Sequence, residues 1–123
     1  MKYLRDVFEF HEKFGIEQPN SPRQLPEDLA KFRLGFLLEE IAEYSAALEA
    51  GDLEAQHDAL IDLVYVALGT ALISGFDFDT GWDRVQAANM AKERALPDGS
   101  NSTRFSKYDV VKPKGWSPPD HSD

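Results

Sequence analysis

The sequence predicts an all-α protein, and three observations lead to this prediction. Apolar residues recur every three to four positions through residues 3–14, 27–50, 53–74 and 81–95, which is the repeat of amphipathic helices. Glycine or proline stands at the ends of most of these stretches. No internal repeat and no second domain is evident. We therefore expect a four-helix-bundle-type core of antiparallel helices, completed by oligomerisation because the chain is short, with an extended C-terminal tail.

The first two helices should flank a loop. Residues 3–14, "YLRDVFEFHEKF", form a short amphipathic helix that Gly15 ends. The following "IEQPNSPRQLP" is predicted as a loop, because each proline disfavours helix in the residue before it. The second helix should begin at Pro26 or Glu27, where proline and acidic residues suit the first turn, and run to about Ala50.

The second half of the chain contains two more predicted helices. Gly51 is a plausible C-cap and Asp52 a plausible N-cap for a third helix over residues 53–74. A fourth helix should start after Asp79 or Thr80 and continue through "GWDRVQAANMAKERA", which ends at residue 95.

From Pro97 on, glycine, serine, asparagine and proline exclude more helix, and residues 105–120 hold at most one short strand. We divide the chain into a helical domain, residues 1–96, and an extended basic and aromatic tail of the same domain, residues 97–123.

Composition and charge exclude several classes of function. The chain has 123 residues, no cysteine and a net charge of −9, so nonspecific nucleic-acid binding is not expected. The N-terminus lacks the apolar core of a signal peptide, and the longest apolar stretch is too short to span a bilayer. We expect a cytoplasmic protein with no membrane partner.

Charge is distributed unevenly along the chain. Residues 1–91 contain 17 acidic and 7 basic residues, whereas residues 92–116 contain 6 basic and 3 acidic ones. This split suits a metal-bound phosphate ligand.

Carboxylates interrupt the apolar faces of the second and third helices. Helical spacing places Glu40 and Glu43 inside the apolar stripe of the second helix, with Glu39 at its edge. On the third helix, Asp58 and Asp62 interrupt a face that is otherwise apolar and small.

These carboxylates also match in height along a helical hairpin. Glu40 and Asp62 each lie 11 residues from Gly51, while Glu43 lies 8 before it and Asp58 lies 7 after it. The two pairs should therefore stand roughly 16 Å and 11 Å from the turn. Four buried, unpaired carboxylates would be costly. A hard divalent cation offsets that cost, and Mg²⁺ fits best, with Mn²⁺ possible.

Two other residues of these faces have expected structural roles. Arg33 lies one face repeat before Glu40 and is expected to pair with a carboxylate. Gly69 is expected to permit close approach of the helices.

The motifs "EEIAE" and "DALIDLVYVAL" resemble those of the MazG-like, all-α nucleoside triphosphate pyrophosphohydrolases. The signature of that superfamily is EExxE on one helix and ExxD on the next. The resemblance implies Mg²⁺ bound by these carboxylates and cleavage of the α–β phosphate bond, which gives a nucleoside monophosphate and pyrophosphate. It also implies a homodimer or a dimer of dimers.

The resemblance transfers to named positions. Glu39, Glu40 and Glu43 match the first motif, and Asp62 matches the aspartate of the second. The expected glutamate before Asp62 is replaced by alanine, and the nearby carboxylate is Asp58, four residues before Asp62. Metal ligation is therefore assigned to Glu40, Glu43, Asp58 and Asp62, while the base stays open between Glu39 and Asp58.

Four residues are candidates for binding the nucleotide. Asn89 and Lys92 match an i, i+3 pattern that family members carry on the following helix. Lys107 and Lys112 lie in a tail with aromatic residues, which either closes over the nucleotide or packs on a neighbouring subunit. This tail resembles a phage and bacterial branch labelled phosphoribosyl-ATP pyrophosphohydrolase-like.

Other functions compete with this one. A di-iron or di-manganese oxidase normally carries Glu-x-x-His on two helices, and this chain has no such pair. A phosphoribosyl-ATP pyrophosphohydrolase-like activity and a non-catalytic helical binding or regulatory module both remain open. The residues do not identify the nucleotide.

Overall fold

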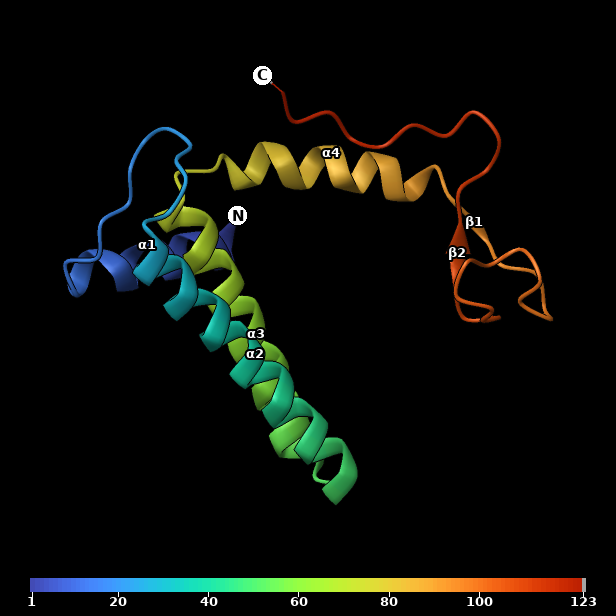
Figure 1. Ribbon diagram of the computed structural model, residues 1–123, viewed down its shortest axis with the longest axis horizontal. Helices are drawn as coiled ribbons and strands as arrows, with labels where there is room; N and C mark the ends of the chain where they lie inside the picture. Colours follow the sequence, from blue (N-terminus) through green and yellow to red (C-terminus); the bar gives the residue numbers. More distant parts are fainter. Residues whose placement is uncertain (123) are drawn as a thin grey trace. The chain divides into compact units, whose positions relative to one another are not determined.

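The protein is all-α, as predicted. A computed structural model describes residues 1–122 and contains, in that part of the chain, four helices and one two-stranded sheet (Figure 1). The chain divides into two compact units after Phe78. We call residues 1–78 the hairpin unit and the part from Asp79 onward the tail unit, and each is described by itself. The extent of the functional domain, residues 1–96, stays a prediction.

The hairpin unit consists of three helices. They are α1 (Lys2–Lys13), α2 (Glu27–Ala50) and α3 (Leu53–Ile73). Helices α2 and α3 lie side by side over their length, and α1 packs against α3 (Figure 1). Small and branched side chains form the buried core of this unit: Val7, Ala47, Ala59, Val66, Leu68, Ala71 and Ile73.

The turn of the α2–α3 hairpin has the predicted caps. Gly51 ends α2 in the left-handed conformation, with φ 66°, which a residue with a Cβ adopts only at a cost. The backbone N–H of Asp52 donates to the carbonyl of Ala47 at 3.1 Å, a bond of the kind that closes a helix with a glycine cap. The side chain of Asp52 then accepts from the N–H of Ala55 at 3.0 Å and begins α3. The caps fix the register of the two helices.

Helix α3 is long and apolar enough, by length and composition alone, to cross a membrane. The same helix packs against α1 and α2, and two aspartates, Asp58 and Asp62, lie along it. These features are those of a core helix in a helical protein, so its hydropathy carries no argument for a membrane.

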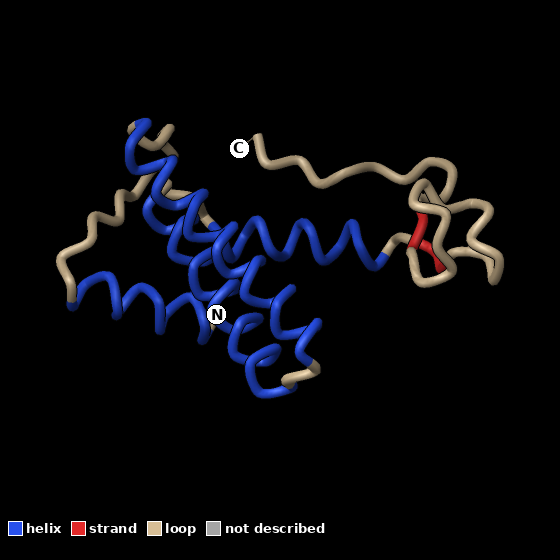
Figure 2. Tube along the Cα trace, turned by 60° about the horizontal axis from the view of Figure 1, so that its bottom comes forward, coloured by secondary structure: helices blue, strands red, loops and turns tan. Residues whose placement is uncertain are grey.

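The tail unit begins with α4, which spans Phe78–Met90 and so starts at the last residue of the hairpin unit. The prediction that this helix continues to residue 95 is wrong. Residues Glu93–Arg94 form strand β1, which pairs antiparallel with β2, Val110–Val111 (Figure 2). The N–H of Ala95 also donates to the carbonyl of Asp109 at 3.0 Å. The strand pairing therefore overrides a local sequence that favours helix. The short strand expected within residues 105–120 is confirmed by β2.

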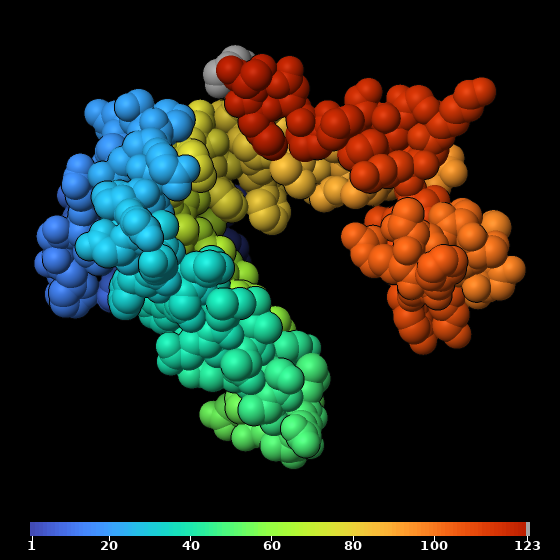
Figure 3. Space-filling model, viewed as in Figure 1, coloured from blue at the N-terminus to red at the C-terminus, as the bar shows by residue number. Residues whose placement is uncertain are grey.

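The end of the tail lies along α4 (Figure 3). The indole N–H of Trp116 donates to the carbonyl of Ala88 at 2.7 Å, and this bond fastens the tail to the helix. A tight turn precedes it, in which the N–H of Trp116 donates to the carbonyl of Pro113 at 3.0 Å and Gly115 has φ 85°. Glycine suits this turn because its third position requires a positive φ.

Candidate active site

Glu40 is the carboxylate that the fold places inside the hairpin. It lies on the face of α2 that packs on α3 and is only 6% exposed. Its Oε2 atom is buried and has no hydrogen-bond partner within the described residues. Burial raises the pKa of Glu40, and the negative charges of Glu43, Asp62 and Glu39 raise it further. A buried oxygen without a partner is costly for the fold, so this position is one that a cation would stabilise.

Asp62 faces the same region from α3. It is half-buried, and its pKa is raised by burial first and then by the charges of Asp58 and Glu43. Carboxylates of α2 and α3 are thus close enough to act on one another electrostatically. This is what their matching distances from Gly51 predict.

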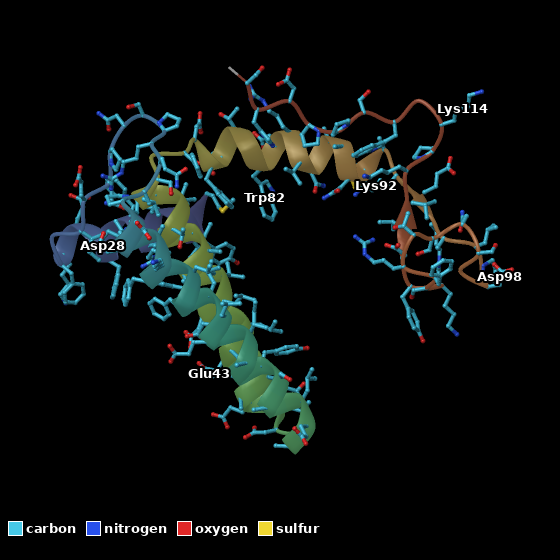
Figure 4. All side chains as sticks on the ribbon, in the orientation of Figure 1. Asp28, Glu43, Trp82, Lys92, Asp98 and Lys114 are labelled. Atoms are coloured by element: carbon cyan, nitrogen blue, oxygen red, sulfur yellow. The ribbon has the colours of Figure 1, made fainter. Side chains whose placement is uncertain are left out.

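The remaining acidic side chains of this layer are exposed. Glu39, Glu43 and Asp58 all face solvent, and Glu43 projects from the side of α2 (Figure 4). The expectation that four carboxylates are buried between the helices is therefore wrong for Glu43 and Asp58. Within residues 1–122, no three histidine or acidic side chains are already close enough together to hold one metal ion. Like charges repel one another, which disfavours a tight cluster of ionised carboxylates. The layer is therefore a set of oxygen donors rather than a closed cage.

A second buried polar cluster lies at the other end of the same face. Arg33 is 7% exposed, and its guanidinium donates to the Thr70 hydroxyl at 3.0 Å and to the Val66 carbonyl at 2.9 Å. Among the described residues it forms no ion pair with a carboxylate. The expectation of a carboxylate partner is therefore wrong, because acceptors on α3 already occupy the guanidinium.

Gly69 makes room for this cluster, and the atoms that lie against it belong to side chains rather than to the backbone of a neighbouring helix. A Cβ at residue 69 would lie 2.8 Å from Nη2 of Arg33 and 3.0 Å from Nε2 of His11. His11, on α1, is 2% exposed, and its Nδ1 lies 3.1 Å from Oε1 of Gln18. Burial lowers the pKa of His11, and the charge of Arg33 lowers it further. Sequence reasoning missed this cluster, since the only signal was a glycine and an arginine on two facing helices.

The four predicted nucleotide-binding residues all belong to the tail unit, and the structure brings two of them together. The Nζ atoms of Lys92 and Lys112 lie 5.3 Å and 5.0 Å from the centroid of the Trp116 ring. Lys107 instead lies over Tyr108, at 5.3 Å. Asn89 has an exposed side chain, and its carbonyl accepts from the N–H of Lys92 at 3.1 Å. Trp116 therefore joins Lys92 and Lys112 in one cluster.

An all-α chain whose helical hairpin carries facing carboxylates has the architecture of the MazG-like nucleoside triphosphate pyrophosphohydrolase superfamily. The family model for phosphoribosyl-ATP pyrophosphohydrolase matches residues 7–89, which include α2, α3 and nearly all of α4. This match covers more than half of the chain, so the chain belongs to that family, and the resemblance found in its motifs is confirmed. The match supports a nucleotide pyrophosphohydrolase-type activity. No curated protein matches the chain.

Proposed function

We propose that this protein is a Mg²⁺-dependent nucleoside triphosphate pyrophosphohydrolase, which cleaves the α–β phosphate bond and releases a nucleoside monophosphate and pyrophosphate. The observation that carries the proposal is Glu40, whose buried and unpartnered Oε2 lies among the charges of Glu43, Asp62 and Glu39. Membership of a pyrophosphohydrolase family supports the same reaction class.

The donor set fits a hard divalent cation. Glu40, Glu43, Asp58 and Asp62 offer only carboxylate oxygens, which Mg²⁺ prefers and which Mn²⁺ also accepts. When bound, Mg²⁺ neutralises charge on the phosphate oxygens and lowers the pKa of its bound water. Burial first, and then the neighbouring negative charges, raise the pKa values of Glu40 and Asp62, and a bound cation would offset both causes.

The side chains of this chain have distinct tasks in the proposed reaction. Glu40 stays fixed by burial in the α2–α3 interface, so one oxygen donor is pre-positioned. Glu39 and Asp58 are exposed at the edge of the layer, where either orients or deprotonates the attacking water. Asn89, Lys92, Lys107 and Lys112, all in the tail unit, are the candidates for binding phosphate and sugar of the nucleotide. Phosphoryl transfer depends mainly on such positioning and charge neutralisation.

The decisive experiment is pyrophosphate release from a panel of ribo- and deoxyribonucleoside triphosphates, with Mg²⁺ and with EDTA. The wild type should release pyrophosphate only with metal, and Glu43→Gln should lose at least about a hundredfold in rate, as expected when a group that stabilises transition-state charge is removed. Glu49→Gln is the matched control, because Glu49 is an exposed glutamate of α2 outside the acidic layer. Release that persists in EDTA, or in Glu43→Gln at the wild-type rate, would refute the proposal.

Phosphoribosyl-ATP is the second candidate substrate, because the matching family model carries that name. The bond cleaved and the product pyrophosphate are the same, so the carboxylates keep their tasks. Including this compound in the panel separates the two candidates. If pyrophosphate is released faster from phosphoribosyl-ATP than from every triphosphate in the panel, phosphoribosyl-ATP is the substrate.

Self-association is part of the proposal. Helix α2 presents four large apolar side chains that are about half exposed and follow helical spacing on one face: Leu34, Leu38, Ile41 and Leu48. Helix α3 adds the exposed residues Leu60, Ile61 and Val64. Apolar stripes of this length are rarely left in water. A second copy of the hairpin would cover them and complete a four-helix core, as a homodimer or a dimer of dimers.

Sedimentation of Leu38→Glu tests the association. The variant should shift the protein toward monomer, because a charge would be buried in the stripe. Phe105→Asn is the control, since Phe105 is 83% exposed on the tail unit and asparagine tolerates its positive φ of 53°. A wild type that sediments as a monomer would contradict the proposal.

A further inference from the structure

A buried hydrogen-bonded link joins α2 to α3 at a height well away from the turn of the hairpin. Nε of Arg33 donates to the Thr70 hydroxyl at 3.0 Å, and its Nη2 donates to the Val66 carbonyl at 2.9 Å. The Thr70 hydroxyl donates to the same carbonyl at 2.8 Å, so the three hydrogen bonds close a ring. Arg33 and Val66 are both buried. Hydrogen bonds from a charged donor in such a dry place are strong ones.

This link lies in line with the candidate metal ligands on both helices. Arg33 lies seven residues before Glu40, which is close to two full turns of α2. Val66 and Thr70 follow Asp62 on α3 at steps of four residues, which keeps them on the same side of that helix. Along the axis, Arg33 is roughly 10 Å from Glu40 at ~1.5 Å per residue. The glycine-capped turn closes the hairpin on the other side, so the carboxylates lie between two fixed points.

A third helix holds the guanidinium in place. A Cβ at Gly69 would lie 2.8 Å from Nη2 of Arg33 and 3.0 Å from Nε2 of His11, so the two side chains together fill the space over the glycine. His11 belongs to α1, and its Nδ1 lies 3.1 Å from Oε1 of Gln18. Close packing of this kind restricts a buried side chain to one position. The donors of Arg33 are thus fixed on α3 by the fold itself.

The link is the main polar contact between α2 and α3 near the carboxylates. In the described part of the chain, the next side-chain hydrogen bond between the two helices runs from Gln56 to the carbonyl of Ala47 at 3.3 Å, close to the turn. Oε2 of Glu40 has no partner. Apolar contacts determine the axial register of two helices only weakly, whereas a buried polar group with partners in one register alone fixes it.

We propose that Arg33 is a positioning residue of the carboxylate site: it fixes the register of α2 on α3, so that Glu40 and Asp62 lie level and can bind one cation together. This role rests on the proposed function, because it takes the carboxylates as the metal ligands. Arg33 lies two turns from Glu40, so it acts through the backbone of α2 and is not a ligand. A register change of one residue moves Glu40 by about 1.5 Å along the axis, more than the ~0.5 Å that a preorganised site tolerates.

The test is a calorimetric titration of the metal-free protein with Mg²⁺, which reports binding without any turnover. Arg33→Met should bind Mg²⁺ at least about tenfold more weakly than the wild type, the loss typical when a group that orients a metal ligand is removed. Arg33→Lys keeps the charge but has one donor nitrogen, so it should recover part of the affinity. Circular dichroism and thermal unfolding are recorded for each variant, because an apolar replacement of a buried polar link can leave stability unchanged.

Two further substitutions separate positioning from charge and from folding. Thr70→Val keeps the guanidinium and removes its hydroxyl acceptor, so it should also weaken Mg²⁺ binding. Combined with Arg33→Met it should add no further loss, because both changes break the same link. Arg23→Met is the matched control, because Nε of Arg23 also donates to a carbonyl of α3, that of Ile73, at 3.0 Å, but from the loop before α2. This control should bind Mg²⁺ like the wild type, whatever its melting temperature.

The proposal is overturned if folded Arg33→Met binds Mg²⁺ as tightly as the wild type, or if Arg23→Met loses as much affinity. If Arg33→Met does not fold, Thr70→Val and Arg33→Lys decide by the same criterion. A wild type that binds no Mg²⁺ would overturn this proposal together with the proposed function. If Mg²⁺ binds and needs Arg33, but no nucleotide is hydrolysed, the positioning role stands and the hydrolase proposal falls.

Discussion

The two units of this chain handle charge in opposite ways. The hairpin unit contains seven of the buried apolar side chains and also buries Arg33, His11 and Glu40. In the described part of the tail unit, Ala95 is the one buried apolar residue, and the lysines stay partly or fully exposed over aromatic rings. Burying a charge is costly and exposing one is cheap. The buried apolar side chains of the hairpin unit offset the cost of burying Arg33, His11 and Glu40.

This difference separates two kinds of candidate site. In the hairpin unit, the pKa values of Glu40 and Asp62 are elevated. The ionised form of these two carboxylates is therefore unfavourable, and a bound cation should stabilise it. The lysines of the tail unit are not buried, so an anion should bind them more weakly and with stronger salt dependence. Unfolding free energies measured with and without metal, in packing variants and across pH test this difference between the units.

Magnesium should produce the largest effect. We expect Mg²⁺ at about a hundredfold excess over its dissociation constant to stabilise the protein by about 3 kcal/mol, measured as a shift of thermal unfolding. Circular dichroism reports mainly on α2 and α3, of 24 and 21 residues, while fluorescence of Trp82 and Trp116 reports on the tail unit. The double variant Glu40→Gln with Asp62→Asn should lose the shift. An unchanged melting temperature in the wild type would favour a non-catalytic binding module.

Packing at Gly69 should produce the next largest effect. Gly69→Ala places a methyl group against the buried Arg33 and His11 side chains and should cost about 1–3 kcal/mol of unfolding free energy, as overpacking does. Gly35→Ala is the control on the facing helix, because a Cβ added at residue 35 would have no neighbouring atom within 4 Å. That variant should gain up to about 1 kcal/mol from helix propensity. Chemical denaturation measures both, and equal effects would show that Gly69 is not a packing position.

The smallest effect should come from protonation of His11. Its pKa in the folded protein lies below the ordinary value of about 6.5, because burial disfavours the charged ring. As pH falls through about 6.5, the unfolded chain therefore binds a proton before the folded one does, and His11 lowers the unfolding free energy. The loss is complete below the folded pKa. Denaturant midpoints between pH 7.5 and pH 5.5 should fall less in His11→Gln than in the wild type, whereas His57→Gln, at an exposed position, should follow the wild type.

Much of the fold could be predicted from local sequence, and the reasons are specific. Gly51 and Asp52 determine the hairpin through their own backbone and side-chain chemistry, and the phase of Glu40 on α2 follows from helical spacing. The end of α4 at Met90 could not be predicted, because the residues after it favour helix until β2, some 18 residues later, pairs with them. The hydrogen-bond partners of Arg33 could not be predicted either. Its guanidinium donates to the Thr70 hydroxyl and the Val66 carbonyl on α3, and not to one of the carboxylates nearby in the sequence. Pairing register and acceptor choice depend on tertiary contacts that no single segment encodes.

The symmetry of the hairpin about Gly51 limits how its length can change during evolution or design. One residue inserted between Glu43 and Gly51 would turn Glu40 by about 100° around the helix axis and carry it off the α3 face. Seven residues, close to two full turns, would return it to within about 20° of its original direction. An equal insertion between Gly51 and Asp58 would keep the aspartates level with the glutamates. Viable changes in length are therefore paired steps of seven residues, one in each arm.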